Sequence, residues 1–329
     1  MQPTQLEERV VERRPLVAHV GKSGASLERW VLDDGSTFVV KRLTPETDLL
    51  MSLTHDLAGR EYTLWARGLL DHLPHGVGHA IVGGWAESGG AVVVMRDLDG
   101  RVLTWDDRLD GDRCRWLMGR LASMHRTFAG VPLEPWGDAL TPLADLVGMF
   151  SPVRMRPHLD GVNQLPRLAT HGWELFEQMV PADVAGPVLE LLRRPAPLVG
   201  ALRRCPCTLV HGDVAVVNMA IESDDLVLLD WSMPAVAPGA LDVARFVAGC
   251  ASVVDLSREE ILDAYAEAAG PAFHEPAMHL GLLAGTVWLG WNKALDATGH
   301  PDPVVRDRER ADLEWWVAQA RTTIRSGLL

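Results

Sequence analysis

The sequence contains little cysteine and no long uninterrupted hydrophobic run. Its 329 residues include four cysteines. The closest pair, Cys205 and Cys207, has C-x-C spacing and not the C-x-x-C spacing of zinc and redox sites, so we expect reduced, mostly buried thiols. The most apolar late segment, Leu280–Trp291, is too short to cross a bilayer. The first fourteen residues are heavily charged and have no apolar core. We therefore expect a cytoplasmic protein with no secretory signal and no membrane partner.

Basic residues are outnumbered by acidic ones. Lys and Arg total 31 and Asp and Glu total 44, which gives a net charge of −13. An acidic chain repels phosphate backbones, so nucleic acid is not expected as a partner. The same charge suits a cationic substrate, although solubility alone is the simpler explanation. Hydrophobic residues make up 47% of the chain, which is enough to fill a sizeable core.

Polar residues at fixed offsets lie among short apolar segments late in the chain. Asp213 precedes Asn218 by five residues, and Asp230 follows Asn218 by twelve. Three apolar segments flank them: Thr208–Val210, Met219–Ile221 and Leu226–Leu229. This pattern predicts a tight loop that opens into a small hairpin. Such a set suits phosphoryl transfer, in which one carboxylate orients the attacking hydroxyl while an amide and a second carboxylate hold magnesium on the phosphates. A solvated hairpin whose Asp and Asn only shape turns is the alternative.

The segment resembles the catalytic loop and metal motif of the aminoglycoside phosphotransferase and choline kinase family, the small-molecule relatives of protein kinases. The loop reads His-Gly-Asp-x-x-x-x-Asn where protein kinases have H-R-D-x-x-x-x-N, and the metal motif reads Asp-Trp-Ser. The resemblance implies that Asp213 is the catalytic residue, that Asn218 and Asp230 bind Mg²⁺, and that His211 supports the loop.

Two further positions follow from the same resemblance. Asp242 matches a family position that braces the catalytic loop, although a carboxylate facing a helix N-terminus explains it equally well. Ser232 departs from the pattern, since many relatives carry an acidic residue there, and this affects how a second Mg²⁺ would be held. The four core residues of an active kinase are all present: Lys41, Asp213, Asn218 and Asp230.

The N-terminal part contains a lysine in a strand-like apolar segment. Lys41 resembles the kinase lysine that contacts the α- and β-phosphates of ATP. Glu61 on the following helix is its expected ion-pair partner, with Glu46 as a second candidate. A lysine on an edge strand is the alternative interpretation.

Two other segments would complete an ATP site. The turn around Gly24 would let backbone N–H groups approach the phosphates, although a plain hairpin turn has the same composition. Its residues of interest are Gly21, Ser23, Gly24 and Ser26. By resemblance, the carbonyl of Arg96 and the amide of Leu98 would read adenine, with Met95 at the back of the pocket.

Hydrophobic periodicity predicts strands first and helices afterwards. The expected strands are Leu16–Val20, Leu27–Leu32, Thr37–Leu43, Ala80–Trp85 and Ala91–Met95. The expected helices are Asp56–Leu70, Arg113–Phe128, Glu174–Arg193, Ala240–Ala251, Arg258–Ala269, His279–Leu295 and Arg306–Arg325. We therefore predict an α+β, bilobal protein-kinase-like fold. Residues 1–97 would form a small N-lobe with a five-stranded antiparallel sheet and one main helix, and residues 98–329 a large, mostly helical C-lobe.

The substrate is less determined by the sequence. Trp288 and Trp291 share a helical face and could stack on a sugar ring or a cation, but core packing is the simpler explanation. Four acidic residues could recognise an amino sugar or only form a solvated helix face: Asp255, Glu259, Glu260 and Asp263. The histidines at 72, 75 and 79 suggest a metal cluster at first sight, but Pro and Gly between them favour a solvated loop.

The function implied by the resemblance is ATP-dependent, Mg²⁺-requiring phosphorylation of a hydroxylated small molecule, by a monomer or homodimer. An aminoglycoside or related antibiotic is the best single class, which would make the protein a resistance enzyme. The close alternative is a metabolic kinase of the same fold acting on a sugar, amino sugar, amino alcohol or homoserine-like compound. A catalytically silent nucleotide-binding module is the alternative from another class.

Overall fold

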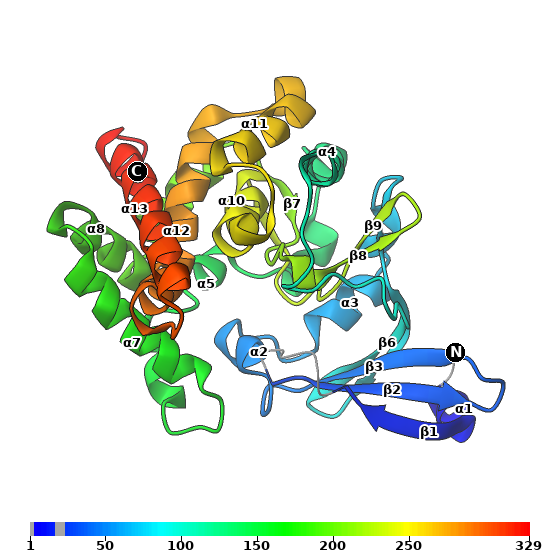
Figure 1. Cartoon of the computed structure of the whole chain (residues 1–329). Coiled ribbons are helices and arrows are strands. Elements are labelled where there is room, and N and C mark those ends of the chain that lie inside the picture. The colour runs from blue at the N-terminus through cyan, green and yellow to red at the C-terminus, as the bar shows by residue number, and fades with distance from the viewer. Residues whose placement is uncertain (1–2, 17–23) are drawn as a thin grey trace.

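The computed structural model describes residues 3–16 and 24–329 (Figure 1). Its N-terminal part is a five-stranded antiparallel sheet in the order β1-β2-β3-β6-β5. The strands are β1 (Val10–Pro15), β2 (Ser26–Leu32), β3 (Thr37–Leu43), β5 (Ile81–Glu87) and β6 (Gly90–Arg96). The sheet lies at one end of the molecule and the C-terminal helix at the other (Figure 1).

Both faces of the sheet are covered, which explains why β6 is apolar without alternation. Val92 and Val94 pack on one side with Trp30, which is fully buried. Val93 belongs to the main core on the other side. Lys41 pairs with Val93 across β3 and β6. Because side chains of paired residues leave a sheet on the same face, Lys41 is directed toward the helical part of the protein.

Short helices precede the first strand and follow β3 in the N-terminal part. They are α1 (Pro3–Glu8), α2 (Leu49–Leu53), α3 (Arg60–Ala66) and the 3-10 helix η1 (Leu69–His72). The predicted single helix Asp56–Leu70 is therefore wrong in extent. Gly59 and Gly68, both in the left-handed region with φ of 76° and 74°, stand at the N-terminal ends of α3 and η1.

The rest of the chain is mostly helical. Its α-helices are α4 (Gly111–Phe128), α5 (Leu143–Val147), α6 (Pro152–Met155), α7 (Leu165–Met179), α8 (Ala182–Arg193), α9 (Ala196–Arg203), α10 (Ala240–Cys250), α11 (Arg258–Ala269), α12 (Glu275–Gly299) and α13 (Pro303–Arg325). Its 3-10 helices are η2 (Glu134–Ala139), η3 (Arg156–His158), η4 (Val216–Asn218), η5 (Ala251–Val253) and η6 (Gly270–Ala272). The long helix α12 packs against α7, α10 and α13 and forms the centre of this part.

Two small sheets lie between the five-stranded sheet and the helices (Figure 1). One pairs β7 (Thr208–Val210) with β10 (Ala235–Ala237). The other pairs β8 (Met219–Glu222) with β9 (Asp225–Leu228), and β9 also pairs in parallel with β4 (Val77–His79). The predicted loop and hairpin of the polar motif are thus present.

The α+β, protein-kinase-like fold predicted from the sequence is confirmed. Besides the helix Asp56–Leu70, two further element predictions are wrong. The first strand is β1 at Val10–Pro15 and not Leu16–Val20, of which residues 17–20 lie outside the described residues. The predicted helix Glu174–Arg193 is two helices, α7 and α8, because Pro181 ends the helical hydrogen bonding between them. Within the described residues, no helix is both long and apolar enough to span a bilayer.

Candidate active site

Lys41 forms two ion pairs that join the sheet to the hairpin segment. Its Nζ lies 2.9 Å from Glu61 Oε2 on α3 and 2.7 Å from Asp230 Oδ1 after β9. The side chains of Lys41 and Glu61 are 7% and 1% exposed, and that of Asp230 is 32% exposed. The Lys41–Glu61 pair predicted from the sequence is therefore present, and Glu46, which instead accepts a hydrogen bond from the Thr44 hydroxyl, is not the partner.

The charges of these three groups depend on one another. Burial opposes the charge of Lys41, but the carboxylates of Asp230 and Glu61 outweigh burial and raise the pKa of Lys41 above its ordinary value. Burial favours the neutral form of Asp230, yet the Lys41 ammonium keeps the pKa of Asp230 below its ordinary value. Burial raises the pKa of Glu61, although Lys41 opposes this.

Helix α3 also holds the segment that follows Asp230. Glu61 Oε1 accepts a hydrogen bond from the Trp231 amide at 3.3 Å, and Arg60 Nη1 donates to the Ser232 carbonyl at 3.0 Å. Asp230 itself has a φ of 60°, which is uncommon for a residue other than glycine. Left-handed residues of this kind are concentrated at functional sites, where surrounding contacts maintain the strain.

Asn218 lies between the two carboxylates of the motif. Its Nδ2 donates to Asp213 Oδ2 at 2.9 Å and to the Asp213 carbonyl at 3.0 Å. The main-chain carbonyl of Asn218 accepts a hydrogen bond, at 2.9 Å, from the amide of Leu229, the residue before Asp230. The structure thus places Asp213, Asn218 and Asp230 on neighbouring ends of β7, β8 and β9.

His211, the residue after β7, supports the loop between β7 and η4 through hydrogen bonds and ring packing. His211 is fully buried, accepts a hydrogen bond from the Asp213 amide at Nδ1 (3.3 Å), and bonds the Leu229 carbonyl through Nε2 (2.9 Å). Its ring also packs edge-on against Trp231, with centroids 4.7 Å apart. These contacts agree with the supporting role expected for His211.

Asp242 fixes the same loop from α10. Its two carboxylate oxygens accept hydrogen bonds from the amides of His211 and Gly212, each at 2.8 Å. The carboxylate is fully buried and also bonds His125 Nε2 at 3.1 Å. Asp242 also lies in the first turn of α10, so it combines the contacts of a bracing residue with the place of a carboxylate at a helix N-terminus.

Two residues near Asp213 have contacts that the sequence did not reveal, one of them a glycine of the motif and the other an arginine outside it. Gly212 has a φ of 85°, and a Cβ atom there would lie 2.0 Å from the Met233 carbonyl oxygen, so only glycine permits this close approach of the two loops. Arg245 on α10 pairs with Asp213, with 2.7 Å between Nη2 and Oδ1. The glycine was visible in the motif, whereas no sequence pattern indicated the arginine.

The predicted nucleotide-binding turn is only partly described. Gly21 and Ser23 lie outside the described residues. Gly24 has a φ of 98°, and a Cβ there would lie 2.3 Å from the Thr47 carbonyl oxygen. Ser26 begins β2 and pairs with Arg42 on β3.

The predicted hinge follows β6. Met95 is buried in the sheet, and Leu98 is buried two residues after the strand ends. The Arg96 side chain bonds Glu222 on β8 (2.5 Å) and the His79 carbonyl (3.2 Å), which ties the five-stranded sheet to the small sheet. These positions leave the roles of Met95, Arg96 and Leu98 toward adenine as a proposal.

The side chains at the motif suit a magnesium ion. Asn218 donates from Nδ2 to Asp213, which leaves its side-chain carbonyl oxygen for a metal, and the Asp230 carboxylate is a second hard oxygen donor. Mg²⁺ in kinases is held by one or two such groups together with nucleotide phosphates, so a larger protein cluster is not required. Among the described residues, no group of three or more His, Cys, Asp and Glu is placed to hold a metal, and this includes the histidines at 72, 75 and 79.

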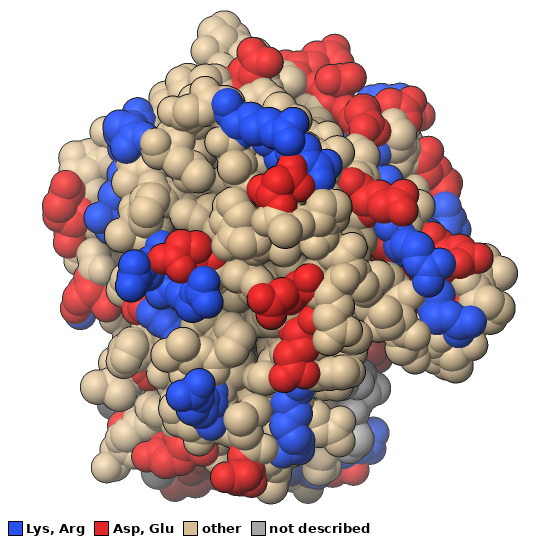
Figure 2. Space-filling model, turned by 90° about the vertical axis from the view of Figure 1, so that its left-hand side faces the viewer, with Lys and Arg blue, Asp and Glu red and all other residues tan. Residues whose placement is uncertain are grey.

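The residues considered for substrate recognition are mostly engaged in packing. Trp291 is buried against Phe150, and Trp288 is buried under the Arg245 guanidinium. Three of the four acidic candidates have structural partners: Asp255 pairs with Arg108, Glu259 accepts from Trp315, and Glu260 forms a capping box with Ser257. Figure 2 shows acidic and basic side chains interspersed on the face at the left of Figure 1.

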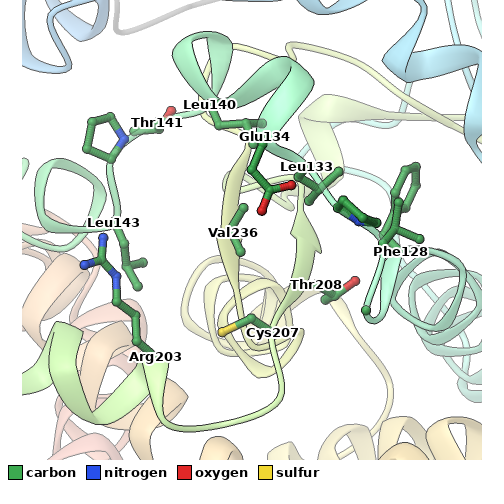
Figure 3. A pocket seen from close by; sticks show the side chains of 15 residues that line it. Phe128, Leu133, Glu134, Leu140, Thr141, Leu143, Arg203, Cys207, Thr208 and Val236 are labelled. Atoms are coloured by element: carbon green, nitrogen blue, oxygen red, sulfur yellow. The ribbon is translucent and has the colours of Figure 1, made fainter.

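A cavity of about 880 Å³ is lined by other residues than Lys41, Asp213, Asn218 and Asp230. It is bordered by Glu134, Arg203, Cys207, Thr208 and Val236 (Figure 3). Thr208 begins β7, whereas the loop carrying Asp213 follows the other end of that strand. None of the residues predicted for nucleotide, metal or catalysis borders this cavity, so its size does not make it the site of chemistry.

Comparison with known proteins extends these observations. A sequence model of one family, described as "Phosphotransferase enzyme family", matches residues 20–280. A search of curated proteins finds no significant match.

Several solved structures share the fold. The GDP complex of aminoglycoside 2'-phosphotransferase-IIIa superposes with a TM-score of 0.56 at 13% identity, covering 96% of this chain and 95% of that chain. Spectinomycin phosphotransferase in complex with ADP and spectinomycin gives 0.51 at 13% identity and covers 99% of both chains. Choline kinase from Streptococcus pneumoniae gives 0.50 at 15% identity and covers 95% of both chains. At such identities the likeness establishes the fold.

Proposed function

The chain belongs to the phosphotransferase enzyme family, and we propose that it transfers the γ-phosphoryl group of ATP to a hydroxyl group of a small molecule. One observation carries this proposal. Lys41 of the sheet is bound to Glu61 and to Asp230, and Asp230 adjoins the Asp213–Asn218 pair. The proposal is supported because the side chains to which we assign phosphoryl transfer come from three separate segments and lie near one another, with the Leu229 amide bonded to the Asn218 carbonyl.

Each of these side chains has a task in the proposed reaction. Asp213 orients the acceptor hydroxyl and accepts its proton as the new O–P bond forms. Lys41 contacts the α- and β-phosphates, and Glu61 keeps its side chain extended toward them. Asn218 and Asp230 hold Mg²⁺, which neutralises charge on the phosphates.

The remaining groups prepare the site. Asp242 and His211 fix the loop that carries Asp213, so that the carboxylate is in place before the acceptor arrives. Backbone N–H groups around Gly21, Ser23, Gly24 and Ser26 would approach the phosphates, and the hinge at Met95, Arg96 and Leu98 would bind adenine. We propose that residues 1–97 supply the nucleotide-binding sheet and that residues 98–329 supply the catalytic hairpin and the substrate-binding helices.

For the acceptor, we propose an aminoglycoside or related antibiotic as the first class to test. The net charge of −13 favours a cationic compound. Phosphorylation adds negative charge to such a drug, which weakens its binding to an anionic target. The solved structure of spectinomycin phosphotransferase, which shares this fold, contains ADP and spectinomycin.

One observation favours a metabolic acceptor instead. Asp255, Glu259 and Glu260 are occupied by Arg108, Trp315 and Ser257, so α11 and the segment before it offer fewer free carboxylates for amino groups than the sequence suggested. Among the metabolic acceptors, a sugar needs no carboxylate partner and is the one that this observation favours, whereas an amino sugar, amino alcohol or homoserine-like compound would still need one; the same catalytic groups would phosphorylate any of them.

A panel of acceptors tests these alternatives. ADP release from Mg·ATP is measured with aminoglycosides, cyclic peptide antibiotics, sugars, amino sugars and amino alcohols, with Asp213→Ala as the control. Stimulation by one compound, absent in the variant, would support the proposal and identify the class. Failure of Mg·ATP to bind at all would contradict it, whereas binding without stimulation by any compound would favour a nucleotide-binding module.

A further inference from the structure

The catalytic loop has an arginine partner outside the motif. Arg245 on α10 directs both Nε and Nη2 at the same oxygen of Asp213, Oδ1, at 2.8 and 2.7 Å. The two side chains are 14% and 18% exposed. A guanidinium held this way on a largely desolvated carboxylate forms strong, charge-assisted hydrogen bonds with a defined geometry.

The surroundings of Arg245 confine its side chain. Gly249, one turn later on α10, leaves room for the guanidinium, because a Cβ atom there would lie 2.3 Å from Nη1. On the other side, the guanidinium carbon lies 5.7 Å from the ring centroid of Trp288 on α12. Between Gly249 and Trp288 the Arg245 side chain has few rotamers open to it. Its packing against Trp288 offsets the conformational entropy lost by ordering it.

The hydrogen bonds of Asp213 distinguish its two oxygens. An ionised carboxylate offers about two acceptor sites on each oxygen. Both sites of Oδ1 are used by Arg245, while Oδ2 accepts one hydrogen bond, from Asn218 Nδ2 at 2.9 Å. Oδ2 therefore retains the acceptor capacity that a substrate hydroxyl needs.

We propose that Arg245 is a positioning residue that fixes the Asp213 carboxylate so that Oδ2 faces the acceptor hydroxyl. This proposal rests on the phosphotransferase function above and assigns the oxygen that acts in it. The hydroxyl proton moves to Oδ2 while the hydroxyl oxygen forms a bond to the γ-phosphorus. The bond from that phosphorus to the β–γ bridging oxygen breaks, and ADP leaves with the electron pair.

The first test compares Arg245→Met with wild type. Turnover of Mg·ATP is measured with water alone as acceptor and with the compound found in the panel. We expect turnover to fall about 100-fold, the size typical of a misplaced catalytic group, while the dissociation constant of Mg·ATP stays nearly unchanged. Arg245→Lys should recover part of the turnover, because an ammonium can still donate to Oδ1.

Two further variants separate position from charge and from general stability. Gly249→Ala keeps Arg245 and its charge but forces the guanidinium away, so turnover should fall although alanine favours a helix. Arg258→Met is the matched control. Arg258 also pairs with a buried carboxylate, Asp312, and lies 5.4 Å from the Trp315 ring centroid, so its loss should lower stability without lowering turnover.

A double variant decides whether Arg245 acts through Asp213. In an Asp213→Ala background, Arg245→Met should cause no further loss of turnover. Additive losses would overturn the proposal, since Arg245 would then act on substrate or nucleotide directly. Wild-type turnover in Arg245→Met, with Asp213→Ala inactive, would also overturn it and leave the phosphotransferase function intact. Activity of Asp213→Ala would instead contradict the proposed function itself.

Discussion

Lys41 Nζ lies 2.7 Å from Asp230 Oδ1, although the two residues are 189 positions apart in the chain. Lys41 belongs to the five-stranded sheet, and Asp230 follows the small hairpin at the helical part. Because Glu61 binds the same ammonium group, the three side chains form one charged unit across the two parts. Changes at any of them should therefore affect both stability and nucleotide binding.

A single variant at Lys41 and a double variant at Lys41 and Glu61 should separate the effect on stability from the effect on nucleotide binding. Lys41→Met leaves the Glu61 carboxylate, which is 1% exposed, without its cation. We expect the free energy of unfolding to fall by about 3 kcal/mol and Mg·ATP binding to weaken. The double variant Lys41→Met/Glu61→Gln removes the charges of the Lys41–Glu61 pair and leaves only the more exposed Asp230 carboxylate without its cation, so it should regain part of the stability but not the binding. Urea unfolding and calorimetric titration measure the two quantities, and normal binding by the double variant would contradict the role of Lys41.

Gly212 and Gly35 form a matched pair for testing the close approach of the two loops. Both have positive φ, 85° and 80°, but a Cβ at Gly212 would lie 2.0 Å from the Met233 carbonyl while a Cβ at Gly35 would meet no atom within 4 Å. Gly35→Ala should cost about 1 kcal/mol of unfolding free energy, from backbone strain alone. Gly212→Ala should cost clearly more and also reduce turnover. Equal costs for the two variants would show that the loops can separate freely.

Asp242 allows a direct comparison between bracing and a helix-end effect. Asp242→Ala removes acceptors from the amides of His211 and Gly212, so the free energy of unfolding should fall by about 3 kcal/mol and turnover should fall with it. Asp302→Ala removes a simple helix cap on α13 and should cost about 1 kcal/mol with turnover unchanged. If the two variants behave alike in both measurements, Asp242 is only a carboxylate at a helix end.

The cysteines provide a chemical test of the fold around the catalytic loop. Burial raises the pKa of the Cys250 thiol to about 11 and that of Cys114 to about 12. At pH 8 a thiol with a pKa near 11 is ionised in roughly one molecule in a thousand, so both should resist alkylation by iodoacetamide in the native protein. Cys207 is partly exposed and should react first. Since Cys250 Sγ lies 3.4 Å from the Val216 amide, rapid labelling of Cys250 would mean that the loop between Asp213 and Asn218 opens.

Local patterns predicted the parts of the fold that depend on neighbouring residues. The bounds of β3 (Thr37–Leu43) and α11 (Arg258–Ala269) were predicted correctly from the local hydrophobic pattern, and the structure shows a capping box with Ser257 at the start of α11. Helix interruptions were less visible. The break at Pro181 and the short α3 depend on local backbone geometry that periodicity alone does not reveal.

The parts of the site that the sequence did not predict depend on contacts between segments that are distant in the chain. The Lys41–Glu61 pair was predicted because the order of strand and helix resembled that of kinases. Arg245 could not be found in the same way, since it reaches Asp213 only because α10 packs against α12 and Gly249 leaves room for the guanidinium. The acidic residues of α11 were considered for substrate binding because their partners in other segments, such as Trp315, are invisible in the sequence.

Asp213→Ala provides the most direct measurement of the central claim. Mg·ATP affinity is determined by calorimetric titration, and phosphorylation of the panel's best acceptor is measured in the same preparation. The account predicts affinity close to that of the wild type together with a loss of turnover of about 100- to 10,000-fold, because Asp213 orients and deprotonates the hydroxyl but does not hold the nucleotide. Wild-type turnover in this variant would contradict the account.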